Sequence, residues 1–258
     1  MRVLMLGDIV GSPGRKAVET LVPKLRKSEK IGFVIANGEN AAGGSGITPR
    51  IADELFASGV DVITSGDHIW NRREVAGYLD ANDKLLRPAN YPKGAYGFGH
   101  CVVEASGCKI GVINLSGRVF MDPIESPFRV AQEIISEIKP RTNNIFLDFH
   151  AEATSEKIAM GWFLDGEISC MAGTHTHVQT ADEKVLPKGT AYITDLGMTG
   201  PHDGVIGRKK EQILSRFLTQ LPTRFEMAED DIQLQGALVD IDEKTGKARS
   251  ITRIQKAL

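Results

Sequence analysis

Residues 32–40 read GFVIANGEN, a short apolar run that ends in a group of polar and glycine residues. The length of GFVIA (residues 32–36) and its β-branched residues favour a buried strand over a helix. Similar runs recur along the chain, and each one ends in polar or glycine-rich residues. The other predicted strands cover residues 2–6, 60–64, 109–115, 144–148, 169–172 and 191–194.

Helical patterns separate the early strands. They cover Arg15–Lys27, Arg50–Ala57 and Arg72–Leu79. This alternation of strand and helix predicts βαβ units and a largely parallel sheet. The sequence has no internal repeat and no obvious linker, so we expect residues 1–258 to form a single domain.

Two hairpins are predicted later in the chain. The strands at 98–104 and 109–115 flank a turn at Ala105–Gly107, and those at 234–241 and 248–254 flank a turn at Glu243–Gly246. Hairpins after βαβ units indicate a mixed sheet, or two sheets packed together.

The composition excludes several classes of protein. With 258 residues, 41% hydrophobic and 25% charged, the chain is neither collagen-like, nor a coiled coil, nor disordered. A net charge of -2 argues against a broad nucleic-acid surface, although a short RNA end could still enter a cleft. The three cysteines form no CxxC pair, and no apolar run is long enough for a signal peptide or a membrane span. We therefore expect a cytoplasmic protein with no membrane partner.

Metal-binding types of side chain follow five of the predicted strands. They are Asp8; Glu39 and Asn40; Asp67 and His68; His150; and His175 and His177. Each could have a purely structural role, as a helix cap, a turn residue or an interior histidine. In open α/β folds, however, ligands bind at the carboxyl ends of the strands, so these side chains are expected to meet. His175 and His177 are two residues apart, and on an extended backbone both imidazoles would point the same way.

The chemistry of this set indicates metal binding. Oxygen and imidazole ligands without a thiolate suit Mn, Fe or Zn rather than a structural cysteine-zinc site. Without His68, this set still offers seven candidate ligands, which are too many for one tetrahedral ion. Two ions roughly 3.5–4 Å apart, bridged by a carboxylate, would use them all. Glu39 is a good bridge because its carboxylate has two oxygens.

Several motifs then suggest a family. They are GD (7–8), GEN (38–40), GDH (66–68), FHAEATSEK (149–157) and GTHTHV (173–178). Together they resemble the calcineurin-like metallophosphoesterases, and more closely the bacterial YmdB-like branch of cyclic-nucleotide phosphodiesterases. The resemblance runs along nearly the whole chain. It also includes RPANYP (87–92), NLSGRVFM (114–121) and LPKGTAYITDLGMTGPHD (186–203).

The resemblance implies a four-layer α/β-β/α sandwich of two mixed sheets flanked by helices, in one metallophosphoesterase domain over residues 1–258. It also implies a dinuclear site for two divalent ions (Fe, Mn or Zn). By matching position, one ion would be held by Asp8, Glu39, Asn40 and His177, and the other by Glu39, Asp67, His150 and His175. The superfamily usually has Asn where this chain has Asp67. The added negative charge should bind the metal more tightly and reduce its Lewis acidity.

The expected activity is hydrolysis of phosphate esters, in particular cyclic nucleotides. A metal-bridged hydroxide would attack phosphorus, and His68 would protonate the leaving group as general acid. Further candidates for substrate contact are Arg118, Thr154 and His202. Thr154 is also expected to cap the helix that follows it.

The sequence lacks the motifs of several other enzyme classes. Gly7–Gly14 has the spacing GxxxGxxG rather than GxGxxG, and the chain contains neither a P-loop nor HExxH, which excludes Rossmann dehydrogenases, P-loop NTPases and zincins. A non-catalytic regulator that keeps the fold and binds metal or nucleotide stays open, as does an RNA-processing phosphodiesterase. Assembly into a homo-oligomer stays open as well.

Overall fold

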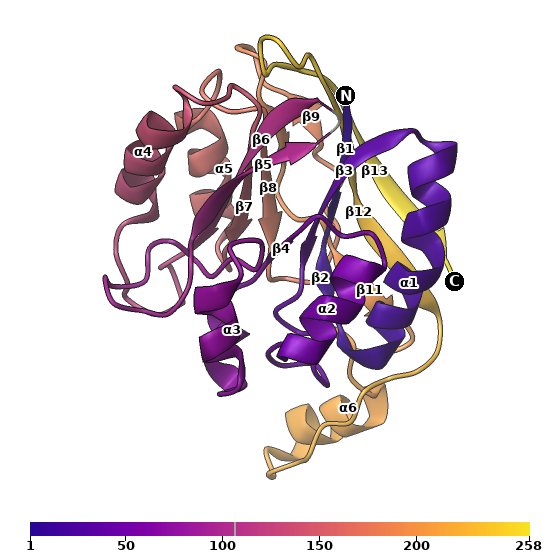
Figure 1. Ribbon diagram of the computed structural model, residues 1–258. Coiled ribbons are helices and arrows are strands. Elements are labelled where there is room, and N and C mark those ends of the chain that lie inside the picture. Colours follow the sequence, from indigo (N-terminus) through magenta and orange to yellow (C-terminus); the bar gives the residue numbers. More distant parts are fainter. Residues whose placement is uncertain (106) are drawn as a thin grey trace.

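Two β-sheets packed face to face, with helices on their outer sides, form the frame of the protein (Figure 1). The computed structural model describes residues 1–105 and 107–258. The first sheet has the order β2-β11-β12-β1-β3-β4, with β13 paired to β12. Its strands are β1 (Arg2–Leu6), β2 (Asp8–Ile9), β3 (Ile31–Asn37), β4 (Val62–Thr64), β11 (Met198–Pro201), β12 (Ile232–Ile241) and β13 (Ala248–Ala257).

The second sheet has the order β5-β6-β7-β8-β10-β9. Its strands are β5 (His100–Ala105), β6 (Cys108–Ser116), β7 (Ile145–His150), β8 (Cys170–Thr174), β9 (Lys184–Val185) and β10 (Ala191–Ile193). Within it β6, β7, β8 and β10 are parallel, and in the first sheet β1, β3 and β4 are parallel. Each sheet is therefore mixed, with a parallel centre.

Helices cover the outer faces of both sheets (Figure 1). The helices of the protein are α1 (Gly11–Ser28), α2 (Pro49–Ala57), α3 (Val75–Ala81), α4 (Pro127–Ile138), α5 (Thr154–Phe163) and α6 (Lys210–Thr219), with a short 3-10 helix η1 (Asp67–Asn71). Of these, α6 projects from the body of the molecule instead of covering a sheet (Figure 1). The apolar residues of α1 and α2 pack on the first sheet, and those of α4 and α5 pack on the second. Among the described residues, no helix has both the length and the apolar character that a bilayer crossing requires.

The period-two pattern of the strands explains this layering. In β1, Val3 and Met5 belong to the core between the two sheets, whereas Leu4 and Leu6 belong to the core beneath α1 and α2. Successive side chains of a strand point to opposite faces, so a strand that is buried on both sides is apolar throughout. The predicted four-layer sandwich is confirmed.

Most predicted elements are present, with small shifts at their ends. The β5–β6 and β12–β13 pairs are antiparallel, as expected for hairpins. The turn predicted at Ala105–Gly107 includes residue 106, which lies outside the described residues. The helix predicted from Arg72 begins at Val75, because the backbone at Arg72, where η1 ends, is extended (φ -121°, ψ 103°).

Candidate metal centre

Polar side chains replace apolar ones at the carboxyl ends of the strands, on the faces that the two sheets turn toward each other. Phe33 of β3 lies in the core between the sheets, and Asn37 follows on the same face. Phe146 of β7 lies in the same core, followed on that face by Asp148 and His150. Asn37 donates a hydrogen bond to Asp148 at 3.0 Å, so the two sheets meet through polar groups here.

Four side chains from four different segments form a compact cluster. Glu39, Asp67, His150 and His175 each offer an oxygen or nitrogen atom, and these atoms lie within 4.8 Å of one another. His150 Nε2 lies 3.2 Å from Glu39 Oε2, 3.2 Å from Asp67 Oδ1 and 3.0 Å from His175 Nδ1. Carboxylates and imidazoles at these separations can hold a metal ion.

The electrostatics of this cluster favour a cation at its centre. Burial opposes a charge on His150, yet the carboxylates of Glu39 and Asp67 raise its pKa well above the usual value. Burial, together with the neighbouring His150, lowers the pKa of His175 to about 4. The carboxylates that favour a proton on His150 Nε2 would equally favour a metal ion there.

A second group of side chains lies beside the first and shares Glu39 with it. The Oδ1 atom of Asp8 lies 3.9 Å from His177 Nε2, and Asn40 Nδ2 lies 3.2 Å from the same nitrogen. Asp8 is fully buried, and its Oδ1 atom has no hydrogen-bond partner within residues 1–105 and 107–258. Burial raises the pKa of Asp8 to about 8. An unpartnered buried carboxylate oxygen is costly, and a bound cation would remove that cost.

Gly66 leaves the space that the first cluster requires. A Cβ atom built at this position would lie 2.2 Å from both Glu39 Oε2 and His150 Nε2. These are far below ordinary contact distances, so no other residue fits without displacing the carboxylate or the ring. The glycine of the GDH motif therefore allows the backbone to pass directly beside the candidate ligands.

His68 lies at the edge of the centre. Its Nδ1 atom is 3.1 Å from Glu39 Oε1 and 2.9 Å from Asn40 Oδ1. Its side chain is 39% exposed, whereas Glu39 is 1% exposed. The hydrogen bond with Glu39 raises the pKa of His68 and so favours the protonated imidazolium. A protonated histidine at an open edge is suited to donating a proton.

The backbone at His175-Thr176-His177 differs from the extended conformation that we expected. His175 and His177 have φ values of 102° and 65°, in or near the left-handed region. Asp195 holds the loop in place, because its Oδ2 atom accepts hydrogen bonds from the Thr176 N–H at 3.2 Å and hydroxyl at 2.8 Å. Lys157, fully buried, donates to the same oxygen at 2.7 Å. The two imidazoles therefore face different halves of the centre rather than lying parallel.

Asp148 and Thr174 orient the His150 ring through its Nδ1 atom, on the side away from the cluster. Thr174 Oγ1 donates to Asp148 Oδ1 at 2.7 Å and lies 2.9 Å from His150 Nδ1. Because the hydroxyl proton points to Asp148, the Nδ1–H of His150 donates to Thr174, which leaves Nε2 as the atom that faces the cluster. Neither residue was predicted to take part in the site, since both lie within buried strands.

A cavity of about 410 Å³ opens onto the centre. Glu39, Asn40, His68, His175 and His177 all line it. Residues that sequence reasoning missed also contribute, chiefly Glu152 and Arg208. Glu152 Oε2 lies 3.3 Å from His175 Nε2, and Arg208 donates to the Gly44 carbonyl at 2.8 Å. Only the place of Glu152 two residues after His150 could have signalled its role.

The three predicted substrate-contact residues do not line this cavity. Arg118 is exposed and donates to the Ile124 carbonyl, while His202 Nε2 lies 3.2 Å from the Met198 carbonyl. Thr154 is the first residue of α5. The prediction that it caps this helix is wrong, because the N-cap is Ala153 and no side chain caps it.

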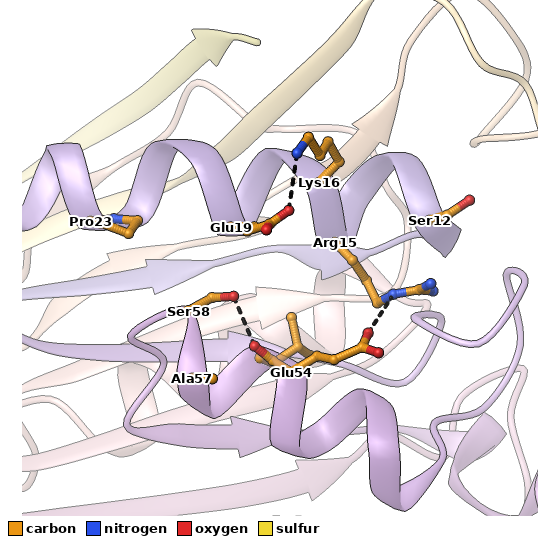
Figure 2. A pocket seen from close by; sticks show the side chains of 9 residues that line it. Ser12, Arg15, Lys16, Glu19, Pro23, Glu54, Ala57 and Ser58 are labelled. Atoms are coloured by element: carbon orange, nitrogen blue, oxygen red, sulfur yellow. Dashed lines mark hydrogen bonds and ion pairs between the residues drawn. The ribbon is translucent and has the colours of Figure 1, made fainter.

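Another hollow lies between α1 and α2 (Figure 2). The charged side chains on its walls pair with one another, as Lys16 does with Glu19 and Arg15 with Glu54. None of the predicted site residues lines it. The charged side chains of this hollow are thus already paired with one another. The cluster at the strand ends is therefore the better candidate for a metal-binding or catalytic site.

Similarity to known proteins identifies the family of this chain. A family model described as YmdB-like protein matches residues 4–254. The chain is 54% identical, over 98% of its length and 96% of the relative, to a protein of Bacillus subtilis (strain 168) named 2',3'-cyclic-nucleotide 2'-phosphodiesterase.

Two solved structures are also similar. One is a hypothetical protein from Thermus thermophilus, with a TM-score of 0.93, 39% identity and coverage of 100% of this chain and 99% of the other. The second is described as a novel phosphatase from Mycoplasma pneumoniae, with a TM-score of 0.93, 34% identity and coverage of 100% and 93%. From the match to nearly the whole chain, we conclude that this protein belongs to the YmdB-like family.

Proposed function

We propose that this protein is a dinuclear-metal-dependent phosphodiesterase that hydrolyses cyclic nucleotides, with 2',3'-cyclic nucleotides as the preferred class. Phosphodiesterase activity rests on the family and on the 54% identity to a named 2',3'-cyclic-nucleotide 2'-phosphodiesterase. The observation that carries the metal assignment is the convergence of distant carboxylates and imidazoles on one cavity, beside the unpartnered Oδ1 atom of Asp8.

The candidate ligands divide into two groups that share Glu39. The first group is Asp8, Glu39, Asn40 and His177, and the second is Glu39, Asp67, His150 and His175. Two divalent ions bound there, Fe, Mn or Zn, would activate a water molecule and neutralise charge on the phosphate. Asp67 adds a negative charge to the second group, which should tighten binding of that ion.

His68 is the proposed general acid. Hydrolysis adds water to phosphorus and breaks a P–O bond, so the released ribose oxygen needs a proton. The Nδ1 atom of His68 is held by Glu39, and this interaction favours the protonated ring. Its partly exposed position at the cavity edge would let the ring reach the leaving oxygen.

The decisive experiment combines metal analysis with an activity assay. Purified protein is loaded with Mn²⁺, Zn²⁺ or Fe²⁺, and hydrolysis of 2',3'-cyclic AMP and bis(p-nitrophenyl) phosphate is measured. Anomalous scattering from crystals then counts and identifies the ions. We expect two ions and turnover of both substrates.

Two ions without turnover of either substrate, under every metal tested, would contradict the proposal. That outcome would instead favour the non-catalytic regulator, which keeps the fold and binds metal or nucleotide.

A further inference from the structure

A further groove lies between the segment of residues 87–99 and helix α4. Its volume is about 780 Å³, within the range of roughly 300–1,000 Å³ that small-molecule sites occupy. Arg87, Tyr91, Lys93 and Phe98 line one wall. The proposed mechanism uses none of these residues.

Tyr91 connects this groove to the segment that carries His68. Tyr91 makes an edge-to-face contact with Trp70, with ring centroids 5.4 Å apart, and Trp70 belongs to η1 together with His68. The preceding residue, Asn90, donates to the Ser116 carbonyl at 2.8 Å, and Ser116 pairs in register with His150. Tyr91 and Asn90 thus tie this end of the groove to the segments that carry His68 and His150.

The wall of the groove combines positive charge with an exposed ring. Lys93 is exposed, and within the part of the chain that the structure describes neither Lys93 nor Arg87 forms an ion pair with a carboxylate. Arg87 donates hydrogen bonds to the carbonyls of Tyr96 and Pro88. Phe98 is 45% exposed. On the facing wall, Arg129 is already paired with Glu125 and Glu133. Unpaired cations beside an exposed aromatic ring are the means by which proteins hold single-stranded nucleic acid.

We propose that this groove binds the nucleotides that precede a terminal 2',3'-cyclic phosphate, so that short RNA 3' ends are substrates as well as mononucleotides. This inference rests on the proposed function. The leaving oxygen that His68 would protonate belongs to the ribose, so the nucleoside lies on the His68 side of the phosphate. The chain upstream of that nucleoside then emerges toward Tyr91, where the groove begins. Arg87 and Lys93 contact its phosphates, and Phe98 stacks on a base.

The test compares two substrates, 2',3'-cyclic AMP and an adenosine trinucleotide that ends in a 2',3'-cyclic phosphate. We expect kcat/KM to be roughly tenfold higher for the trinucleotide, from one stacked base and its phosphate contacts. Lys93→Gln and Phe98→Ala should each remove most of this preference and leave hydrolysis of 2',3'-cyclic AMP unchanged. Added salt should also reduce the preference, because phosphate contacts are screened.

Controls separate this inference from the proposed function. Lys109→Gln removes another exposed lysine, at the amino end of β6, and should keep the trinucleotide preference. Arg87→Gln is less informative, since Arg87 also holds the Tyr96 carbonyl and its loss could loosen the loop. If the unaltered protein and both variants, Lys93→Gln and Phe98→Ala, hydrolyse the two substrates with equal kcat/KM, the groove proposal is wrong. The proposed function would still stand. Failure to hydrolyse either substrate would overturn the proposed function instead.

Discussion

At the scale of single residues, the candidate centre assigns different tasks to chemically similar side chains. His150 is fully buried, and its Nδ1 atom is held by Thr174, whereas His68 is 39% exposed and its Nδ1 atom contacts Glu39. The first environment is that of an oriented ligand, and the second is that of a proton donor. Position relative to solvent, rather than residue type, therefore distinguishes the two.

Replacing a buried histidine should remove metal. We expect His150→Ala or His175→Ala to bind one ion instead of two and to lose most of the phosphodiesterase activity, because each ring belongs to only one of the two ligand groups. Elemental analysis of the purified variants, beside a bis(p-nitrophenyl) phosphate assay, measures both effects. Retention of two ions in either variant would show that the ligand assignment is wrong.

Replacing His68 should affect the rate and spare the metals. We expect His68→Ala to keep both ions and to lower kcat by roughly 10²–10⁴-fold, the usual contribution of a general acid. The loss should be largest for alkyl esters and smallest for p-nitrophenyl esters, whose leaving group hardly needs a proton. Loss of metal from this variant, or an equal loss of rate for all esters, would argue against the acid role.

At the scale of elements, the junction between β4 and η1 requires a residue without a side chain, Gly66. Gly66 has a φ of -152°, so a left-handed backbone is not the reason that glycine occupies this position. In Gly66→Ala, the added Cβ atom would collide with Glu39 and His150. We expect this variant to fold, as judged by circular dichroism, and to lose metal from the second ligand group.

Gly77→Ala is the matched control, since a Cβ atom at Gly77 meets nothing within 4 Å. It should keep its metal content and its activity. Normal metal content in Gly66→Ala would mean that the ions lie elsewhere.

Helix α6 and the residues after it project from the body of the molecule (Figure 1). Phe217 is 70% exposed, Leu218 is 84% exposed and Leu221 is 64% exposed. Exposed apolar patches of this kind mark interfaces between proteins. If the protein forms a homo-oligomer, we expect it to use this face, and Phe217→Ser with Leu218→Ser to reduce the mass measured by light scattering. Ile158→Ser on α5, which is 42% exposed, is the control. An unchanged oligomer in the double variant would place the interface elsewhere.

At the scale of the whole molecule, the two sheets are joined by an apolar core and, at the edge that carries the candidate centre, by polar contacts that include the carboxylate of Asp148. Asp148 of β7 accepts hydrogen bonds from Asn37 and Thr64 of the first sheet and from Thr174 of the second. Burial raises the pKa of Asp148, while these three donors act in the opposite direction and favour the charged form. The shared core supports our proposal that residues 1–258 form one domain.

Removing this connection should weaken the whole fold. We expect Asp148→Ala to lower the free energy of unfolding by about 3 kcal/mol, because three buried donors lose their acceptor. Asp148→Asn keeps one acceptor oxygen and should cost less. Urea denaturation followed by fluorescence compares the two. Equal stability of Asp148→Ala and the unaltered protein would show that the polar contact between the sheets contributes little.

The order of elements and the candidate ligands could be predicted from the sequence, because both depend on local patterns. Apolar runs such as residues 32–36 predict strands on their own, and Asp8, Glu39 and His150 follow such runs directly. The pairing of the ligands into two groups came from family resemblance and not from spacing. Only the tertiary structure shows that candidate ligands surround Gly66 and that Thr174, bonded to Asp148, holds the Nδ1 atom of His150.

The remaining features depend on contacts between distant segments, which no local pattern contains. Arg208 enters the cavity because it holds the carbonyl of Gly44, far away in the sequence. The bend at His175 and His177 depends on Asp195 and on the buried Lys157. The sequence determined which chemistry is available, since side-chain types and strand ends are local properties. The tertiary structure decided where each group points, because that is set by the packing of one sheet against the other.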